Sequence, residues 1–389
     1  MFDNAGGTQI LSRVVDYLNE FLFKMNVQTG GSYDLSLKAA AAMMSGREAM
    51  MQLINASRPE EIAFAPSSTV ALQNLAKSMA SQFEPGDEII VTVSDHESNI
   101  GPWVRLEDIG VKIVTWPVDK DSLELSLEDL QALMTERTRL VAVTYVSNIL
   151  GTINPIADIA KIVHESDALI CVDAVAYAPH RAIDVAALDV DYLVFSLYKV
   201  FGPHFAVLYG KYDLFADLDN LYHYFYGKDK VPAKLEPGNA SYELGYSSIG
   251  IVDYLAELAE RAGHSGTQRE KIEFAFEMIT AHENLIAERL LSYLRERSDC
   301  RIIGFDHGDD VRRVPTISFV VAGHDSGEIA AKIDAFNIAI RFGDFHARRL
   351  VEYLGLAGGN GCVRVSMTHY NTLEEVDALI AALDEVLGS

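Results

Sequence analysis

The stretch FSLYKVFGPHFAVLYG, residues 195–210, places a lysine between two apolar runs. The first run ends in Ser196-Leu197-Tyr198-Lys199, a Gly202-Pro203 turn follows, and then a second apolar run begins. Lysine is normally a solvated surface residue, whereas both flanking runs are typical of buried strands. An amine in such a low-dielectric place has a lowered pKa and can form a Schiff base. We therefore expect Lys199 to be a reactive amine at the end of a buried strand.

The sequence around this stretch alternates short apolar runs with helical segments from about residue 61 to residue 211. The runs are rich in Val, Ile and Tyr and almost continuously apolar, as in strands that are covered on both faces. This pattern predicts an α/β fold with a mostly parallel central sheet flanked by helices. After about residue 250, long helices and a few short strands indicate a smaller α+β domain. We expect three parts: an N-terminal arm (1–18) that packs with the small domain, a large cofactor-binding domain (19–255) and a small C-terminal domain (256–389).

The composition of the chain limits its partners. The 389 residues carry a formal net charge of −24, which repels phosphate backbones and anionic lipid, so we expect no nucleic-acid or membrane partner. No window offers the roughly 18 uncharged apolar residues that a membrane helix needs. We expect no signal peptide, because MFDNAGGTQIL lacks a basic segment followed by an apolar one. The three cysteines are far apart and lack metal-type spacing, which favours a reduced, cytoplasmic protein without a metal site.

Polar side chains follow four of the predicted strands, at the edge where ligands gather in open α/β sheets. These side chains are His96 in VSDHESN, Asn148 in TYVSNILGT, Asp173 in CVDAVAYAPH, and Ser196 with Lys199 in FSLYK. The start of a predicted helix adds Ser67-Ser68-Thr69, where free backbone N–H groups favour an anion. An amine, a carboxylate that can keep a pyridine nitrogen protonated, a flat imidazole and a phosphate cradle together predict a site for pyridoxal 5′-phosphate (PLP).

The sequence resembles the class V aminotransferase family, PLP enzymes of fold type I, and most closely its cysteine-desulfurase-like branch. The resemblance extends over nearly the whole chain. It is carried by FDNAGGTQ, DHESNIGPW, YVSNILGTINPI, VDAVAYAPHRAIDVAALDVDYLVFSLYKVFGPH, KLEPGNASYE, IAIRFGDFHARRLV and CVRVSMTHYNTLEEVD.

The resemblance implies a role for each candidate residue. Lys199 would form the Schiff base with the cofactor, Asp173 would pair with the pyridine nitrogen, and His96 would stack on the ring. Asn148 would approach the ring hydroxyl or the substrate carboxylate, and Arg364 would bind that carboxylate, a task that suits a bidentate guanidinium. Arg341 is a weaker candidate for the same region. The phosphate would be bound by Ser68, Thr69, Ser196 and, in place of a family histidine, Tyr198.

In the family a residue of the neighbouring subunit also reaches the phosphate, and Asn239 occupies its position in this sequence. The resemblance therefore implies a homodimer with active sites at the subunit interface. Two departures concern the chemistry of the site. His346 stands where the desulfurases carry a nucleophilic cysteine on a mobile loop, and Ala176 stands where a glutamine usually bonds the cofactor's ring oxygen.

These departures shape the expected function. We expect a C–S lyase that eliminates a β-substituent from a cysteine-derived amino acid, because a sulfur in a good leaving group needs no enzyme thiolate. His346 could then protonate the leaving group, since an imidazole exchanges protons near neutral pH. An aminotransferase is the alternative, and an amino-acid racemase or epimerase is the third. A PLP-binding accessory protein without turnover is the hypothesis from another class.

Overall fold

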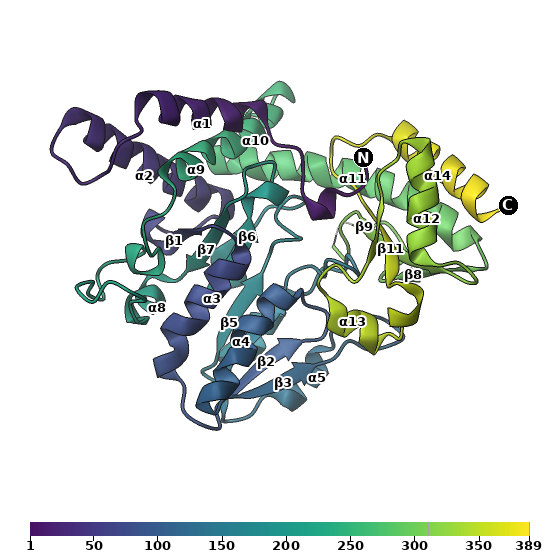
Figure 1. Cartoon of the computed structure of the whole chain (residues 1–389), viewed down its shortest axis with the longest axis horizontal. Coiled ribbons are helices and arrows are strands. Elements are labelled where there is room, and N and C mark those ends of the chain that lie inside the picture. The colour runs from purple at the N-terminus through teal and green to yellow at the C-terminus, as the bar shows by residue number, and fades with distance from the viewer. Residues whose placement is uncertain (310, 389) are drawn as a thin grey trace.

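The computed structural model describes residues 1–309 and 311–388, which form two β-sheets with helices around them (Figure 1). In the large sheet β7 is antiparallel to both of its neighbours, and the other pairings are parallel. The spatial order of its strands is β1 (Ile62–Ala65), β7 (Ala206–Gly210), β6 (Tyr192–Ser196), β5 (Leu169–Asp173), β4 (Thr138–Thr144), β2 (Glu88–Thr92) and β3 (Lys112–Trp116). The predicted α/β fold with a mostly parallel sheet is confirmed.

Helices cover the large sheet on both faces, which explains why its strands are apolar throughout. In β4, Val141 and Val143 belong to one hydrophobic core, whereas Leu140 and Ala142 belong to another on the opposite face. The first face is covered by α2 (Asp34–Ile54), α6 (Ile156–His164), α10 (Ile249–Arg261) and the first half of α11 (Gln268–Glu296). The second face is covered by α3 (Ser68–Met79), α4 (Gly101–Val104) and α8 (Tyr212–Asp217).

Shorter helices and one N-terminal helix complete this part of the chain. They are α1 (Ser12–Lys24), α5 (Leu127–Leu133), α7 (Val185–Leu188) and α9 (Tyr242–Ser247). The part of the chain that the structure describes has no helix with both the length and the apolar character needed to cross a membrane.

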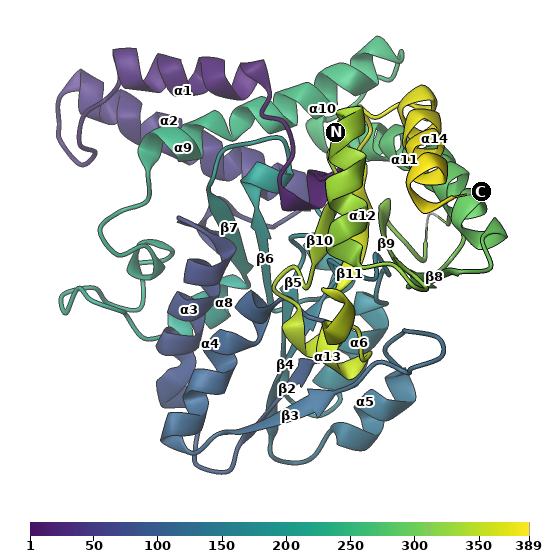
Figure 2. The same cartoon turned by 45° about the vertical axis from the view of Figure 1, so that its right-hand side comes forward.

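The second sheet is small and fully antiparallel, and its own hydrophobic core includes the second half of α11 (Figure 2). Its strands lie in the order β10 (Arg341–Gly343), β11 (Cys362–Ser366), β9 (Thr316–Val321) and β8 (Cys300–Ile303). The remaining helices are α12 (Ser326–Ile333), α13 (Arg348–Tyr353) and α14 (Leu373–Leu387). The expected boundary at 255/256 falls inside α10, and the division into three parts stays a prediction.

The N-terminal segment lies beside the small sheet, as Figures 1 and 2 both show. The backbone N–H of Phe2 donates to the carbonyl of Ala339 at 2.8 Å, and the N–H of Ser366 donates to the carbonyl of Phe2 at 2.8 Å. The same segment then reaches the lysine turn, where Thr8 N–H donates to the carbonyl of Tyr198 at 3.0 Å. The first eight residues therefore connect the two sheets at the edge where the strand-end side chains gather.

Candidate active site

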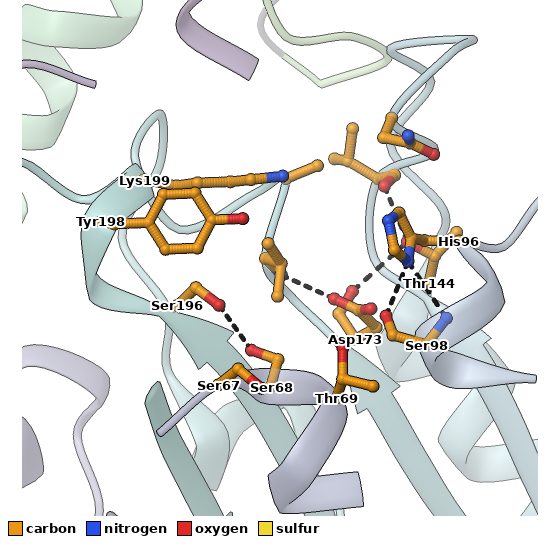
Figure 3. A pocket seen from close by; sticks show the side chains of 14 residues that line it. Ser67, Ser68, Thr69, His96, Ser98, Thr144, Asp173, Ser196, Tyr198 and Lys199 are labelled. Carbon is orange, nitrogen blue, oxygen red and sulfur yellow. Dashed lines mark hydrogen bonds between the residues drawn. The ribbon is translucent and has the colours of Figure 1, made fainter. Parts of the chain in front are cut away.

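The carboxyl ends of β4, β5 and β6 meet the N-terminus of α3 around a cavity (Figure 3). Eight of the residues singled out in the sequence line it: Ser68, Thr69, His96, Asn148, Asp173, Ser196, Tyr198 and Lys199. The sheet brings them together because parallel strands end at one edge. Ser67, Ser98, Thr144, Val146, Val175 and Ala176 complete the lining.

Lys199 ends a 3-10 turn directly after β6, and its side chain is buried, with 8% of the residue exposed. Burial lowers the pKa of its amine to about 8, and the positive charge of Arg364 acts in the same direction. Figure 3 shows Lys199 and His96 reaching into the cavity from opposite sides. The amine is therefore held in an apolar place where its neutral, nucleophilic form is within reach near neutral pH.

Asp173 is the last residue of β5 and is also buried. Burial raises the pKa of its carboxyl group to about 6, whereas the N–H of Val175, which donates to Oδ1 at 2.9 Å, and the charge of Lys199 oppose that shift. Above pH 6 the carboxyl is ionised and faces the cavity. A buried carboxylate in this position suits a partner that carries a proton on a ring nitrogen.

His96 precedes a short 3-10 helix and accepts a hydrogen bond from the N–H of Ser98 at its Nδ1, at 3.1 Å. The Ser98 hydroxyl lies 2.8 Å from the same nitrogen. Burial lowers the pKa of His96 to about 4, with Lys199 and His346 as further causes. The ring is therefore a neutral, flat group at physiological pH, as stacking on an aromatic cofactor requires.

Sequence reasoning missed two residues that hold the His96 segment in place. Ser98 orients the imidazole, and Asp95, which is fully buried, accepts hydrogen bonds from Asn99 Nδ2 at 2.7 Å and from Thr144 N–H at 3.1 Å. Burial raises the pKa of Asp95 to about 8. Both residues lie in the quoted VSDHESN stretch, so their position next to His96 was the signal available for finding them.

The N-terminus of α3 offers a small anion site. Ser67 caps the helix by accepting a hydrogen bond from Val70 N–H, and the hydroxyls of Ser68 and Ser196 lie 2.7 Å apart. The first amides of this 12-residue helix have no partner within the helix and favour negative charge. Hydroxyls and amides at one helix end fit a phosphate group.

A second cavity adjoins the first and shares His96, Asn148, Tyr198 and Lys199 with it. The further candidates Arg341, His346 and Arg364 line this second cavity. They lie near the lysine but not around the anion site. The division suits a cofactor in the first cavity and a substrate in the second.

Arg364, on β11, is 3% exposed and has three neighbours around its guanidinium. Nη1 donates to the carbonyl of Asn148 at 3.1 Å, Nη2 donates to Oδ1 of Asp3 at 3.4 Å, and the Phe345 ring centre lies 3.8 Å from Cζ. Sequence reasoning did not assign roles to Asp3 or Phe345. Asp3 lies in the quoted FDNAGGTQ segment and Phe345 directly precedes His346.

The segment that carries His346 is docked against the site through its backbone. Asn148 Nδ2 donates to the carbonyl of Phe345 at 2.8 Å, and Glu97 N–H donates to the carbonyl of His346 at 2.8 Å. Phe345 and His346 both have a positive φ, 50° and 60°, which L side chains rarely adopt. This turn holds the His346 ring 5.2 Å from the ring of His96.

The three cysteines are poor nucleophiles for this site. Cys171 and Cys362 are fully buried, and burial raises the pKa of the Cys362 thiol to about 11 and that of Cys171 well above its ordinary value. Burial also raises the pKa of Cys300 to about 12. The thiolate is the reactive form of cysteine, so these thiols are held in their unreactive form.

Two further residues with a predicted role at the phosphate have different surroundings. Tyr198 lines both cavities, and its ring stacks on His204 with centroids 4.7 Å apart. Asn239 lines a separate pocket with Glu236 and Tyr242. Its role at the phosphate of a neighbouring subunit stays a prediction.

The side chains present fit PLP. The first cavity offers an amine of lowered pKa, a buried carboxylate, a neutral imidazole and hydroxyls at a helix N-terminus. Asn148 Oδ1 is buried and, within the described residues, has no hydrogen-bond partner. An unpaired buried acceptor of this kind is costly unless a ligand donates to it.

The fold and this donor set define the chain as a PLP-dependent enzyme of fold type I. The model of the family "Aminotransferase class-V" matches residues 1–231 and 268–379. The chain belongs to that family, and pyridoxal phosphate is its cofactor.

Individual relatives agree with this placement. The "Aminotransferase-like protein FGM3" of Gibberella zeae is 41% identical over 394 residues, which cover 99% of this chain and 94% of that protein. The "Cysteine desulfurase-like protein ustD" of Aspergillus flavus is 32% identical over 399 residues, covering 99% and 87%. The apo structure of a cysteine desulfurase from Thermococcus onnurineus NA1 superposes with a TM-score of 0.88 at 26% identity, covering 100% of this chain and 94% of that one.

Proposed function

We propose that the protein is a C–S lyase that removes a sulfur leaving group from Cβ of a cysteine-derived amino acid. The observation that carries the proposal is the position of His346, whose ring lies 5.2 Å from His96 at the cavity that Arg364 and Lys199 also line. The buried, protonated thiols support it as well, because they leave no thiolate to take sulfur from the substrate.

The residues of the site divide the reaction among them. Arg364 binds the α-carboxylate through the Nε–Nη2 edge of its guanidinium, where Nε has no hydrogen-bond partner among the described residues. Bound pyridoxal phosphate supplies an electron-poor ring that takes up the negative charge left at Cα. Asp173 keeps the ring nitrogen protonated, and Lys199 Nζ, once free, takes the proton from Cα. His346 gives a proton to the departing sulfur.

The elimination is balanced without an oxidant. The Cβ–S bond breaks, its electron pair leaves with sulfur, and a thiol and 2-aminoacrylate are formed. Water then converts 2-aminoacrylate to pyruvate and ammonium. The proton that Lys199 removes and the proton that His346 supplies cancel in the overall reaction.

Transamination is the second candidate, favoured by the 41% identical relative whose name is "Aminotransferase-like protein FGM3". One panel of assays separates the candidates on the purified holoenzyme. Pyruvate with a released thiol from S-substituted cysteines, or with a released sulfenic acid from their sulfoxides, supports elimination. Exchange between amino and keto acids without thiol release supports transamination, and inversion at Cα in deuterated water supports epimerisation.

The role of His346 is tested with two leaving groups. His346→Ala is expected to lower kcat on an S-alkyl cysteine by about 10²-fold, as for loss of a general acid. It is expected to leave kcat on S-(4-nitrophenyl)cysteine nearly unchanged, because nitrothiophenolate leaves without a proton. His307→Ala, an exposed histidine in a separate segment beside Asp306, is the matched control. An equal loss on both substrates would contradict the proton transfer.

A further inference from the structure

The N-terminal segment delivers one carboxylate to the two arginines of the substrate cavity. Oδ1 of Asp3 lies 3.4 Å from Nη2 of Arg364, and Oδ2 lies 3.6 Å from Nη1 of Arg341. The Asp3 side chain is 20% exposed and the Arg341 side chain 57% exposed. Asp3 therefore bridges a buried guanidinium and a solvated one.

The position of Asp3 is fixed on both sides by hydrogen bonds. Before it, Phe2 pairs with Ala339 and Ser366 of the small-sheet region, and after it, Ala5 N–H donates to the hydroxyl of Ser366 at 2.8 Å. The chain then reaches Tyr198, next to the active-site lysine. Because both flanks are held, the Asp3 carboxylate has a fixed place beside two arginines that line the cavity.

Arg364 keeps one edge for a ligand while it contacts Asp3. Its Nη1 is used by the carbonyl of Asn148, and one face is covered by Phe345. Its Nε is buried and, among the described residues, has no hydrogen-bond partner. A carboxylate that binds the Nε–Nη2 edge would share Nη2 with Asp3 and satisfy Nε.

We propose that Asp3 sets the charge selectivity of this cavity, so that it takes amino acids with a single carboxylate and an uncharged side chain. The inference rests on the proposed function in one respect, that Arg364 binds the α-carboxylate. Two guanidinium groups face the fixed carboxylate of Asp3, and the acidic residue Asp344 lines the cavity beside them. The substrate's α-carboxylate completes the pairing of Arg364. A second substrate carboxylate would have to compete with Asp3 for Arg341.

Asparagine and aspartate form a suitable pair of probes, because they have nearly the same shape and differ by one charge. The dissociation constant of each is measured from the change in cofactor absorbance when the holoenzyme is titrated, which requires binding but no elimination. For the native protein we expect aspartate to bind at least about 10-fold more weakly than asparagine. In Asp3→Asn we expect the ratio to fall to about 1 or to invert, because Arg341 becomes free to pair with the second carboxylate.

Two further variants keep the test independent of a folding defect in Asp3→Asn. Arg341→Gln in the native background should weaken aspartate binding more than asparagine binding, so that the ratio rises above its native value. Asp16→Asn, an exposed acidic residue of α1, is the matched control and should leave the ratio unchanged. An unchanged ratio in Asp3→Asn, or equal weakening of both ligands, would overturn the proposal.

The failure of this inference can be told apart from the failure of the proposed lyase. If Arg364→Gln leaves both amino acids bound as tightly as before, the shared premise of carboxylate binding is wrong. If the ratio responds to Asp3→Asn but no thiol is released from any S-substituted cysteine, the selectivity stands and the elimination does not.

Discussion

Lys199→Met should stabilise the cofactor-free protein at neutral pH. The Lys199 amine is buried beside Arg364, and no described residue accepts a hydrogen bond from Nζ. Its pKa is lowered from 10.5 to about 8. Each tenfold change in proton affinity is worth about 1.4 kcal/mol, so holding the protonated amine in the fold costs about 3 kcal/mol. Methionine fills a similar volume without the charge, and we expect the free energy of unfolding to rise by about that amount.

The stability gained by Lys199→Met should decrease as the pH rises. In the unfolded chain Lys199 keeps its proton up to about pH 10.5, whereas the folded protein releases it near pH 8. Below pH 8 both states are protonated and the full cost is present. Between pH 8 and pH 10.5 the unfolded state binds more protons, so the stability of the native protein rises with pH. The advantage of Lys199→Met should therefore be largest at pH 7 and vanish above about pH 10.5.

The measurement is urea-induced unfolding of the cofactor-free proteins at pH 7 and at pH 10.5. Lys234→Met is the matched control, because Lys234 is equally buried but its Nζ donates to the carbonyls of Ala216 and Leu218 at 2.9 and 2.8 Å. Its loss leaves two carbonyls unpaired and should destabilise the protein by about 1–3 kcal/mol. A Lys199→Met protein that is less stable than the native one at pH 7 would refute the reasoning. A stability difference between the two proteins that is the same at both pH values would also refute it.

Three further outcomes follow from the same geometry. Asp173→Ala should still bind pyridoxal phosphate but slow the exchange of the Cα proton with deuterated water by about 10²-fold or more, as followed by proton NMR. Ser196→Ala should weaken cofactor binding by about 10-fold, the worth of one hydrogen bond to an anion, in an absorbance titration. Gly151→Ala should lower the thermal midpoint strongly, because φ is +67° and the new Cβ would lie 2.2 Å from the carbonyl oxygen of Thr316. Gly263→Ala is the control: its φ is +84°, but the new Cβ would meet open space, so it should cost only about 1–2 kcal/mol of backbone strain.

The large sheet could be predicted from the sequence because its strands other than the edge strand β3 are buried on both faces. Continuous apolar runs such as the one in β4 leave little doubt between a core strand and a surface one. The clustering of Asp173, Asn148 and Lys199 then follows from topology, since the carboxyl ends of neighbouring parallel strands meet at one edge. For the large sheet, the apolar runs in the sequence therefore predict both the strands and the edge at which the site residues meet.

The substrate cavity could not be predicted in the same way, because long-range contacts form it. Asp3 meets Arg364 across 361 positions of the chain, and Asn148 meets Phe345 across 197. No periodicity encodes such pairs. The left-handed backbone at Phe345 was also hidden, since phenylalanine does not signal a positive φ. The strands β8 and β11 are short, and the sequence pattern alone did not single them out as strands of the small sheet.

The docking of the 341–347 segment bears directly on the chemistry. A nucleophile that accepts sulfur has to carry it away, which suits a segment that can move. Here the backbone carbonyls of Phe345 and His346 accept hydrogen bonds from Asn148 and Glu97, and Arg349 pairs with Glu97 at 3.0 Å just beyond them. A side chain fixed at one place suits a proton donor, because a proton leaves with the product and the donor can stay where it is. In the proposed elimination, His346 and the anchoring of its segment therefore act together, because the proton donor stays in place while the sulfur product leaves.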